Sequence, residues 1–218
     1  MLKIYSQLTG NAFSVNKEEL SNAKVGVFGF GALGKISYKR ELTGEENLLS
    51  KFASLSRETG TILLSGAITD NYGVIKKSVV VCEKGKLIGI CDATLIQNES
   101  AFSGGGAFRV YYLNGLKLGV LVDCDLFNPE GVKALSLCDA DIIVCVTASP
   151  EKPEHNFLVR AYAYLYGAPF YLLTQNSVIA SDIHGEITGK SNKNTSTVII
   201  PTKKQYTLFK LKRRGVRE

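Results

Sequence analysis

The chain has 218 residues, of which 45% are hydrophobic and 21% charged, and its mean hydropathy is +0.06. These proportions are typical of a folded globular protein and exclude a disordered or fibrous chain. No apolar run approaches the roughly 20 residues that a membrane-spanning helix needs. The N-terminal sequence MLKIYSQLTGNAF also lacks the long apolar core of a signal peptide. We therefore expect one domain over residues 1–218, located in the cytoplasm and without a membrane partner.

The cysteines and the charges exclude two further classes of protein. The five cysteines include no C-x-x-C pair, and the chain has only two histidines, so we expect no metal site and no cofactor. The net charge of +6 is concentrated in a basic C-terminal tail at about residues 203–218. A nucleic-acid interface would need a basic stripe interleaved with aromatic residues across a domain, whereas a basic tail is typical of a solvated terminus, so no nucleic-acid partner is expected.

Short apolar runs rich in Val, Ile and Leu predict a series of strands. In chain order they are residues 2–5, 24–28, 61–65, 74–81, 86–91, 117–124, 141–146, 170–174, 197–200 and 206–210. Helical patterns lie at residues 17–23, 45–58, 129–138 and 154–166, and Gly60 and Gly167 follow two of them as C-caps. The turn at residues 83–85 predicts a β-hairpin, and residues 191–197 predict a surface loop. Hairpins mixed with strand–helix alternation indicate an α/β domain with mixed sheets.

The segment from Gly29 to Gly34 spells G-x-G-x-x-G directly after a predicted strand. This is the dinucleotide-binding fingerprint, in which glycines allow a pyrophosphate to approach the first turn of a helix. The fingerprint also needs a second strand that ends in a ribose-binding acid about twenty residues further on. Here that region reads ELTGEENLLSK, a loop that leads into a helix. Dinucleotide binding is therefore a minor alternative.

Four segments of the chain carry a family resemblance in the correct order. The segment KLGVLVDCDLFNPE resembles the nucleophile strand of the nitrilase, or carbon–nitrogen hydrolase, superfamily. The stretches TILLSGAITD with the following hairpin, the run after Glu99, and FLVRAYAYLYGAPFYLLTQN resemble neighbouring motifs of that family. The resemblance implies a four-layer α-β-β-α sandwich (nitrilase-like) whose members usually pair through their helices into dimers.

The resemblance also implies where a catalytic triad of glutamate, lysine and cysteine should lie. The family's cysteine attacks a carbonyl or nitrile carbon, its glutamate acts as base, and its lysine stabilises the oxyanion. Aligned on the motifs, these three positions hold Phe30, Ala93 and Asp123. Phenylalanine cannot accept a proton, alanine cannot stabilise an anion, and aspartate repels one. The triad is degenerate, with no member intact.

Two nearby residues keep a catalytic alternative open. Cys124 falls one position after the aligned nucleophile, and Glu99 lies near a second acidic position of the family. In a regular strand Cys124 would point away from Asp123, and no replacement for the lysine is visible. His155 and His184 are expected at the surface. The leading interpretation is a non-catalytic binding or assembly homologue, a homodimer or higher homo-oligomer that holds a small amide or carboxylate ligand. The alternative is an amidase-like hydrolase of non-peptide C–N bonds that uses Cys124 with Glu99.

Overall fold

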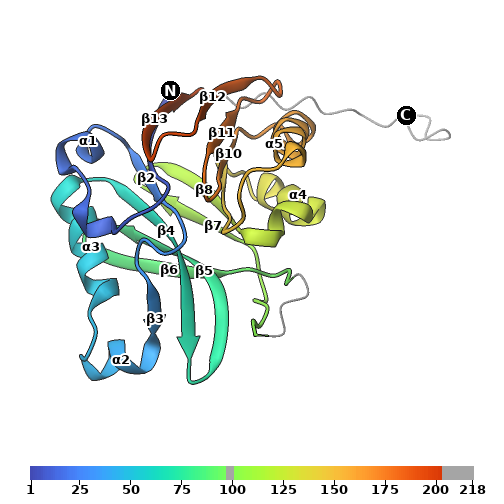
Figure 1. The fold of residues 1–218 in the computed structure, drawn as a ribbon. Coiled ribbons are helices and arrows are strands. Elements are labelled where there is room, and N and C mark those ends of the chain that lie inside the picture. Colours follow the sequence, from blue (N-terminus) through green and yellow to red (C-terminus); the bar gives the residue numbers. More distant parts are fainter. Residues whose placement is uncertain (97–100, 203–218) are drawn as a thin grey trace, which may run out of the picture.

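Two β-sheets packed face to face form the centre of the molecule (Figure 1). In the computed structural model, which describes residues 1–96 and 101–202, helices cover the outer face of each sheet. The layers run α1 and α3, first sheet, second sheet, then α4 and α5. This arrangement is the four-layer α-β-β-α sandwich expected from the sequence.

The first sheet has seven strands among the described residues, in the order β13-β1-β2-β4-β5-β6, with β3 paired to the far half of β4. The strands β1, β2 and β4 run parallel, whereas β13, β5 and β6 pair antiparallel with their neighbours. Their bounds are β1 Leu2–Gln7, β2 Val25–Phe28, β3 Lys35–Ser37, β4 Ile62–Asn71, β5 Val74–Glu83, β6 Lys86–Asp92 and β13 Thr195–Ile200.

The second sheet has six strands in the same part of the chain, in the order β12-β11-β10-β9-β8-β7. Its central strands β8, β9 and β10 are parallel, and the outer pairs are antiparallel. Both sheets are therefore mixed, as predicted. The bounds are β7 Arg109–Leu113, β8 Leu116–Val122, β9 Ile142–Val146, β10 Phe170–Leu173, β11 Val178–Ser181 and β12 Ile187–Ser191.

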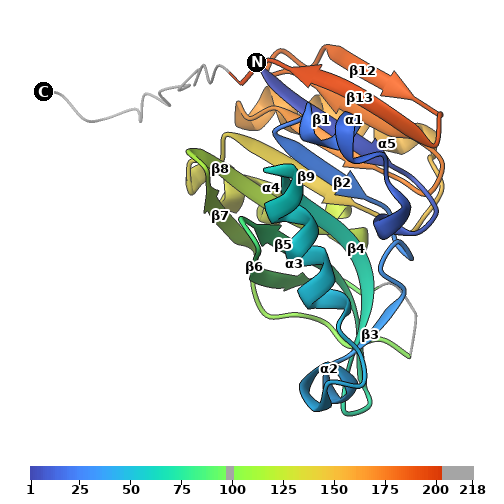
Figure 2. The same cartoon turned by 90° about the vertical axis from the view of Figure 1, so that its left-hand side faces the viewer.

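Helices occupy the two outer layers, and Figure 2 shows α1 and α3 lying across the first sheet. The glycine that follows α3 and the one that follows α5, Gly60 and Gly167, have φ angles of 67° and 65°, so both C-caps predicted from the sequence are confirmed. The short helix predicted before β2 is also present. The bounds are α1 Lys17–Ser21, α2 Tyr38–Thr43, α3 Leu48–Thr59, α4 Pro129–Leu137 and α5 Pro153–Tyr166, with 3₁₀ turns at Ala12–Ser14 and Asp123–Phe127.

Burial on both faces explains why the strands read as continuous apolar runs. In β4, Leu64 faces the core between the two sheets, whereas its neighbour Leu63 faces the core beneath the outer helices. In β8, Val120 faces the core between the two sheets, whereas Leu121 packs beneath α4 and α5. Because successive side chains point to opposite faces, a sheet covered on both sides needs apolar residues at every position.

Two predicted elements have different bounds in the structure. The strand predicted at residues 117–124 ends at Val122, because the chain turns there into the 3₁₀ helix. The loop predicted at residues 191–197 is largely strand: β12 extends to Ser191 and β13 begins at Thr195. These polar residues lie in strands because β13 pairs with β1, which the local sequence does not reveal. The strand predicted at residues 206–210 and the basic tail lie outside the described residues.

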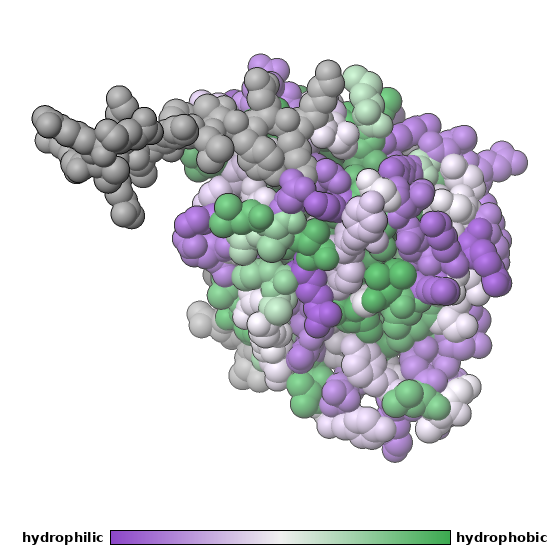
Figure 3. Space-filling model, turned by 180° about the vertical axis from the view of Figure 1, so that it is seen from behind, coloured by the Kyte–Doolittle hydropathy of each residue, from purple (hydrophilic) through white to green (hydrophobic). Residues whose placement is uncertain are grey.

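The outer edges of the sheets expose some apolar side chains. Leu87 and Ile88 of β6 and Tyr112 of β7 are exposed, and the view from behind in Figure 3 shows hydrophobic areas between hydrophilic ones. In the part of the chain that the structure covers, no helix combines the length and the apolar character that crossing a bilayer requires.

Candidate functional site

The carboxyl ends of the parallel strands in the second sheet lie at one edge, where α/β proteins commonly bind ligands. Asp123 follows β8, Thr147 follows β9 and Thr174 follows β10. Asp123 has a φ angle of 50°, in the left-handed region that few residues other than glycine adopt. The aligned nucleophile position therefore lies on a sharp turn between a strand and a 3₁₀ helix.

Hydrogen bonds from several elements converge on the carboxylate of Asp123. The Thr147 hydroxyl donates to Oδ1 over 2.8 Å, and the Ala148 backbone N–H donates to the same oxygen over 3.0 Å. The ammonium of Lys77 donates to Oδ2, also over 2.8 Å. Burial raises the pKa of Asp123, but the bonds from these three residues outweigh burial and hold it below its usual value. Asp123, which is only 3% exposed, is thus an ionised, hydrogen-bonded carboxylate.

Lys77 comes from β5 of the first sheet, so its ion pair with Asp123 joins the two sheets. Ala93, which holds the aligned lysine position, lies directly beside Lys77: its N–H donates to the Lys77 carbonyl over 2.9 Å. The Phe102 ring lies over the ammonium, with 5.1 Å between Lys77 Nζ and the ring centroid. No replacement for the lysine is visible in the sequence near Ala93, but the structure places the Lys77 ammonium of the neighbouring strand at this site. The available signal was a pair of lysines, Lys76 and Lys77, inside a strand of mostly apolar residues.

Cys124 and Asp125 continue the turn. The Cys124 thiol is partly exposed and lies 3.6 Å from Asp123 Oδ2. Strand alternation does not separate Cys124 from Asp123 as expected, because both residues belong to the 3₁₀ helix. Asp125 Oδ1 accepts bonds from the backbone N–H groups of Thr94 and Leu95 over 2.8 and 2.9 Å. These bonds fix the segment after β6 to the end of β8.

Phe30, at the aligned glutamate position, packs as an apolar residue. It lies two residues after β2, and its ring covers Gly66 of β4 so closely that a Cβ there would lie 2.7 Å from Phe30 Cδ2. Phe30 also contacts the core between the sheets. Glu99, the acidic candidate, lies outside the described residues.

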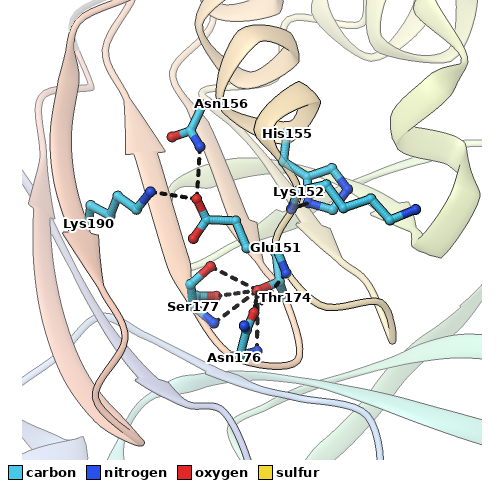
Figure 4. A network of polar contacts seen from close by, with 8 residues as sticks. All are labelled: Glu151, Lys152, His155, Asn156, Thr174, Asn176, Ser177 and Lys190. Atoms are coloured by element: carbon cyan, nitrogen blue, oxygen red, sulfur yellow. Dashed lines mark hydrogen bonds and ion pairs between the residues drawn. The ribbon is translucent and has the colours of Figure 1, made fainter.

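A polar network holds the loop that follows β9 (Figure 4). Glu151 accepts hydrogen bonds from Asn156 over 2.8 Å and from Lys190, and its N–H donates to Asn176 Oδ1 over 2.7 Å. Burial raises the pKa of Glu151, but bonds from Lys190, Ser177 and Asn156 lower it overall. The network fixes the loop that also carries Thr147 and Ala148.

His155 lies under this loop and is 1% exposed, so its predicted position at the surface is wrong. Its ring packs against Phe127 at 6.1 Å between centroids, and its Nδ1 accepts a bond from the Lys152 N–H. The apolar face of the imidazole is covered by the 3₁₀ helix, which a single sequence does not show. His184 is exposed, as predicted.

The segment from Gly29 to Gly34 does not have the geometry of a dinucleotide site. The residues after Gly34 form β3, which pairs with β4, so the motif leads into a strand and not into a helix N-terminus. Within residues 1–96 and 101–202, no group of three His, Cys, Asp or Glu side chains is placed to hold a metal ion.

Comparisons with known proteins agree with this architecture. The sequence profile of the carbon-nitrogen hydrolase family matches residues 25–207. A curated relative, a nitrilase from Pyrococcus abyssi (strain GE5 / Orsay), is 33% identical over 92 residues, which make up 41% of this chain and 35% of the relative. The match thus spans about a third of that relative's length. The chain belongs to the carbon–nitrogen hydrolase family, within the nitrilase superfamily.

Solved structures share the fold at low identity. A carbon-nitrogen hydrolase from Helicobacter pylori G27 has a TM-score of 0.70 at 17% identity, over 90% of this chain and 87% of that one. An amidase from Nesterenkonia sp. has a TM-score of 0.71 at 14% identity, over 90% and 88% of the two chains. A variant of that amidase carries the acetamide moiety of fluoroacetamide on its active-site cysteine. At such identities the likeness establishes the fold.

Proposed function

We propose that this chain is a non-catalytic member of the carbon–nitrogen hydrolase family that acts in binding or assembly. The observation that carries the proposal is the saturated carboxylate of Asp123 at the aligned nucleophile position. A carboxylate that is already bonded to an ammonium, a hydroxyl and an N–H is a poor nucleophile and a poor base.

The other aligned positions support the same conclusion. Phe30 is packed against Gly66 and offers no proton acceptor, and Ala93 offers no cation. Lys77 restores a cation nearby, but its Nζ is bonded to Asp123. Loss of a single oxyanion donor costs about 10²–10³ in turnover, and here nucleophile and base are replaced as well.

An amidase-like hydrolase through Cys124 is the second candidate, favoured by the partly exposed thiol beside Asp123 and Lys77. Hydrolysis would require the thiolate, because the thiolate is the attacking form. The carboxylate of Asp123, 3.6 Å from the sulfur, repels that negative charge. We therefore expect Cys124 to be unreactive.

The test is an assay of the purified chain with short amides and nitriles, beside a C124S variant. We expect no ammonia release above the level of C124S, no fluoroacetamide adduct by mass spectrometry, and iodoacetamide labelling of Cys124 that stays slow at neutral pH. Ammonia release that disappears in C124S would overturn the proposal and establish the amidase alternative.

For the assembly function we infer a homodimer formed through the face of α5 and the end of α4. Phe157, Tyr164 and Leu165 are exposed along one stripe of α5, and Leu137 at the end of α4 is 78% exposed. The Ser136 hydroxyl donates to the Tyr166 carbonyl, which places Leu137 beside the end of α5. A stripe of large apolar side chains on the outside of a helix is typical of a protein interface.

A further inference from the structure

The groups that bond Asp123 belong to other elements and are aimed at its carboxylate from both sheets. Lys77 is part of β5, and Thr147 and Ala148 follow β9. Their donors lie 2.8, 2.8 and 3.0 Å from the two oxygens, the distances of well-formed bonds to a carboxylate. We call these three residues the cradle.

The backbone segments that carry the cradle are held by hydrogen bonds that do not involve Asp123. The Thr147 N–H donates to the Leu173 carbonyl over 2.9 Å, and the Thr147 hydroxyl accepts a bond from the Ser149 N–H over 3.1 Å. This second bond directs the hydroxyl proton toward Asp123. On the opposite side, the backbone of Lys77 is fixed in β5 by its pairing with Ala93. Donors fixed in this way would present the same site to any carboxylate.

Asp123 also has a backbone conformation that a residue with a side chain rarely adopts. A φ angle of 50° is unfavourable for a residue with a Cβ and persists where surrounding contacts determine it. Asp123 is 3% exposed, so its side chain fills the space in front of the cradle. Glycine would adopt the same angle without strain and would leave that space empty.

We propose that the cradle of Lys77, Thr147 and Ala148 is a carboxylate-binding site whose ligand is the chain's own Asp123 side chain. Asp123 thus acts as a built-in occupant that keeps the site closed to external carboxylates. The inference rests on the proposed non-catalytic function, since it explains what the groups around the aligned nucleophile position bind in a chain without the triad. Removing the Asp123 side chain opens the site to a small carboxylate such as acetate, which matches the lost group atom for atom.

The test is thermal unfolding of the full chain carrying D123G, in sodium acetate and in sodium chloride of equal ionic strength. A ligand that binds the folded state alone raises Tm with its concentration. We expect acetate at ten times its Kd to raise the Tm of D123G by about 3–6 °C and to leave wild-type Tm unchanged. Acetamide, the neutral isostere, should not replace acetate, because it lacks the negative charge that the Lys77 ammonium bonds in Asp123.

Two controls separate the cradle from general salt effects. D123N keeps the space filled, and D123G with K77M removes the cation, so neither should respond to acetate. If D123G is unfolded in buffer, the same comparison is made by refolding it from urea. The yield of folded protein is then measured in sodium acetate and in sodium chloride. An equal acetate response in D123G, wild type and the K77M double variant would overturn the inference. Ammonia release by the wild-type chain would instead overturn the proposed function, so the two failures are distinguishable.

Discussion

At the scale of single residues, the ion pair between Lys77 and Asp123 dominates the site. The two side chains are 14% and 3% exposed, so the Asp123 carboxylate is compensated by a cation that is itself largely withdrawn from water. Removing one partner of a buried pair leaves an uncompensated charge, which typically costs 3–5 kcal/mol. We expect K77M to lower the free energy of unfolding by about 3 kcal/mol, and K77M with D123N to lower it by less, as measured by urea denaturation.

Lys117 provides the matched control. It pairs with Asp139 at the surface, where the side chains are 40% and 51% exposed, and such pairs contribute about 0–1 kcal/mol. If K77M proves no more destabilising than K117M, the buried pair does not stabilise the fold as argued.

His155 makes stability depend on pH. Burial lowers the pKa of His155, and the bond from the Lys152 N–H requires an unprotonated Nδ1. A depressed pKa in the folded state means that the unfolded chain binds more protons, so stability falls as pH drops below the unfolded value of about 6.5. We expect the free energy of unfolding to decrease between pH 7.5 and 5.5, and H155Q to remove that part of the decrease. The exposed His184 supplies the control: a loss of the same slope in H184Q would contradict this assignment.

At the scale of elements, the apolar runs predicted most strands, because sheets buried on both faces require apolar residues at successive positions. The site was harder to predict. The sequence places Asp123 at the end of a strand. The contact with Lys77 depends on how the first sheet packs on the second, which the sequence does not reveal. Two adjacent lysines in a strand covered on both faces imply that one of them points inward, which is the signal in the sequence for Lys77. The buried position of His155 had no comparable signal.

The turn between β2 and β3 supports a prediction at the same scale. Gly31 and Gly34 have φ angles of 92° and 70°, so these glycines serve a tight connection to β3. We expect neither NAD nor NADP to raise the Tm of the wild-type chain, and G31V to lower Tm through backbone strain alone. A nucleotide-dependent rise in wild type that is lost in G31V would show that the motif binds dinucleotides after all.

At the scale of the whole molecule, the two helical layers differ in what they expose. On the layer of α4 and α5, Phe157 is 70% exposed and Leu165 lies eight residues further along the same helical stripe. Away from this layer, α2, which contacts β3 and β4, exposes Leu42 without such a stripe. Two copies that meet through α5 would bury Phe157 and Leu165 against the same residues of the partner, since a two-fold interface uses the same patch twice.

We expect the wild-type chain to be a dimer by light scattering and the double variant F157E with L165E to be a monomer, whereas L42E should remain dimeric. A monomeric wild type, or equal dissociation by L42E, would contradict assembly through this face.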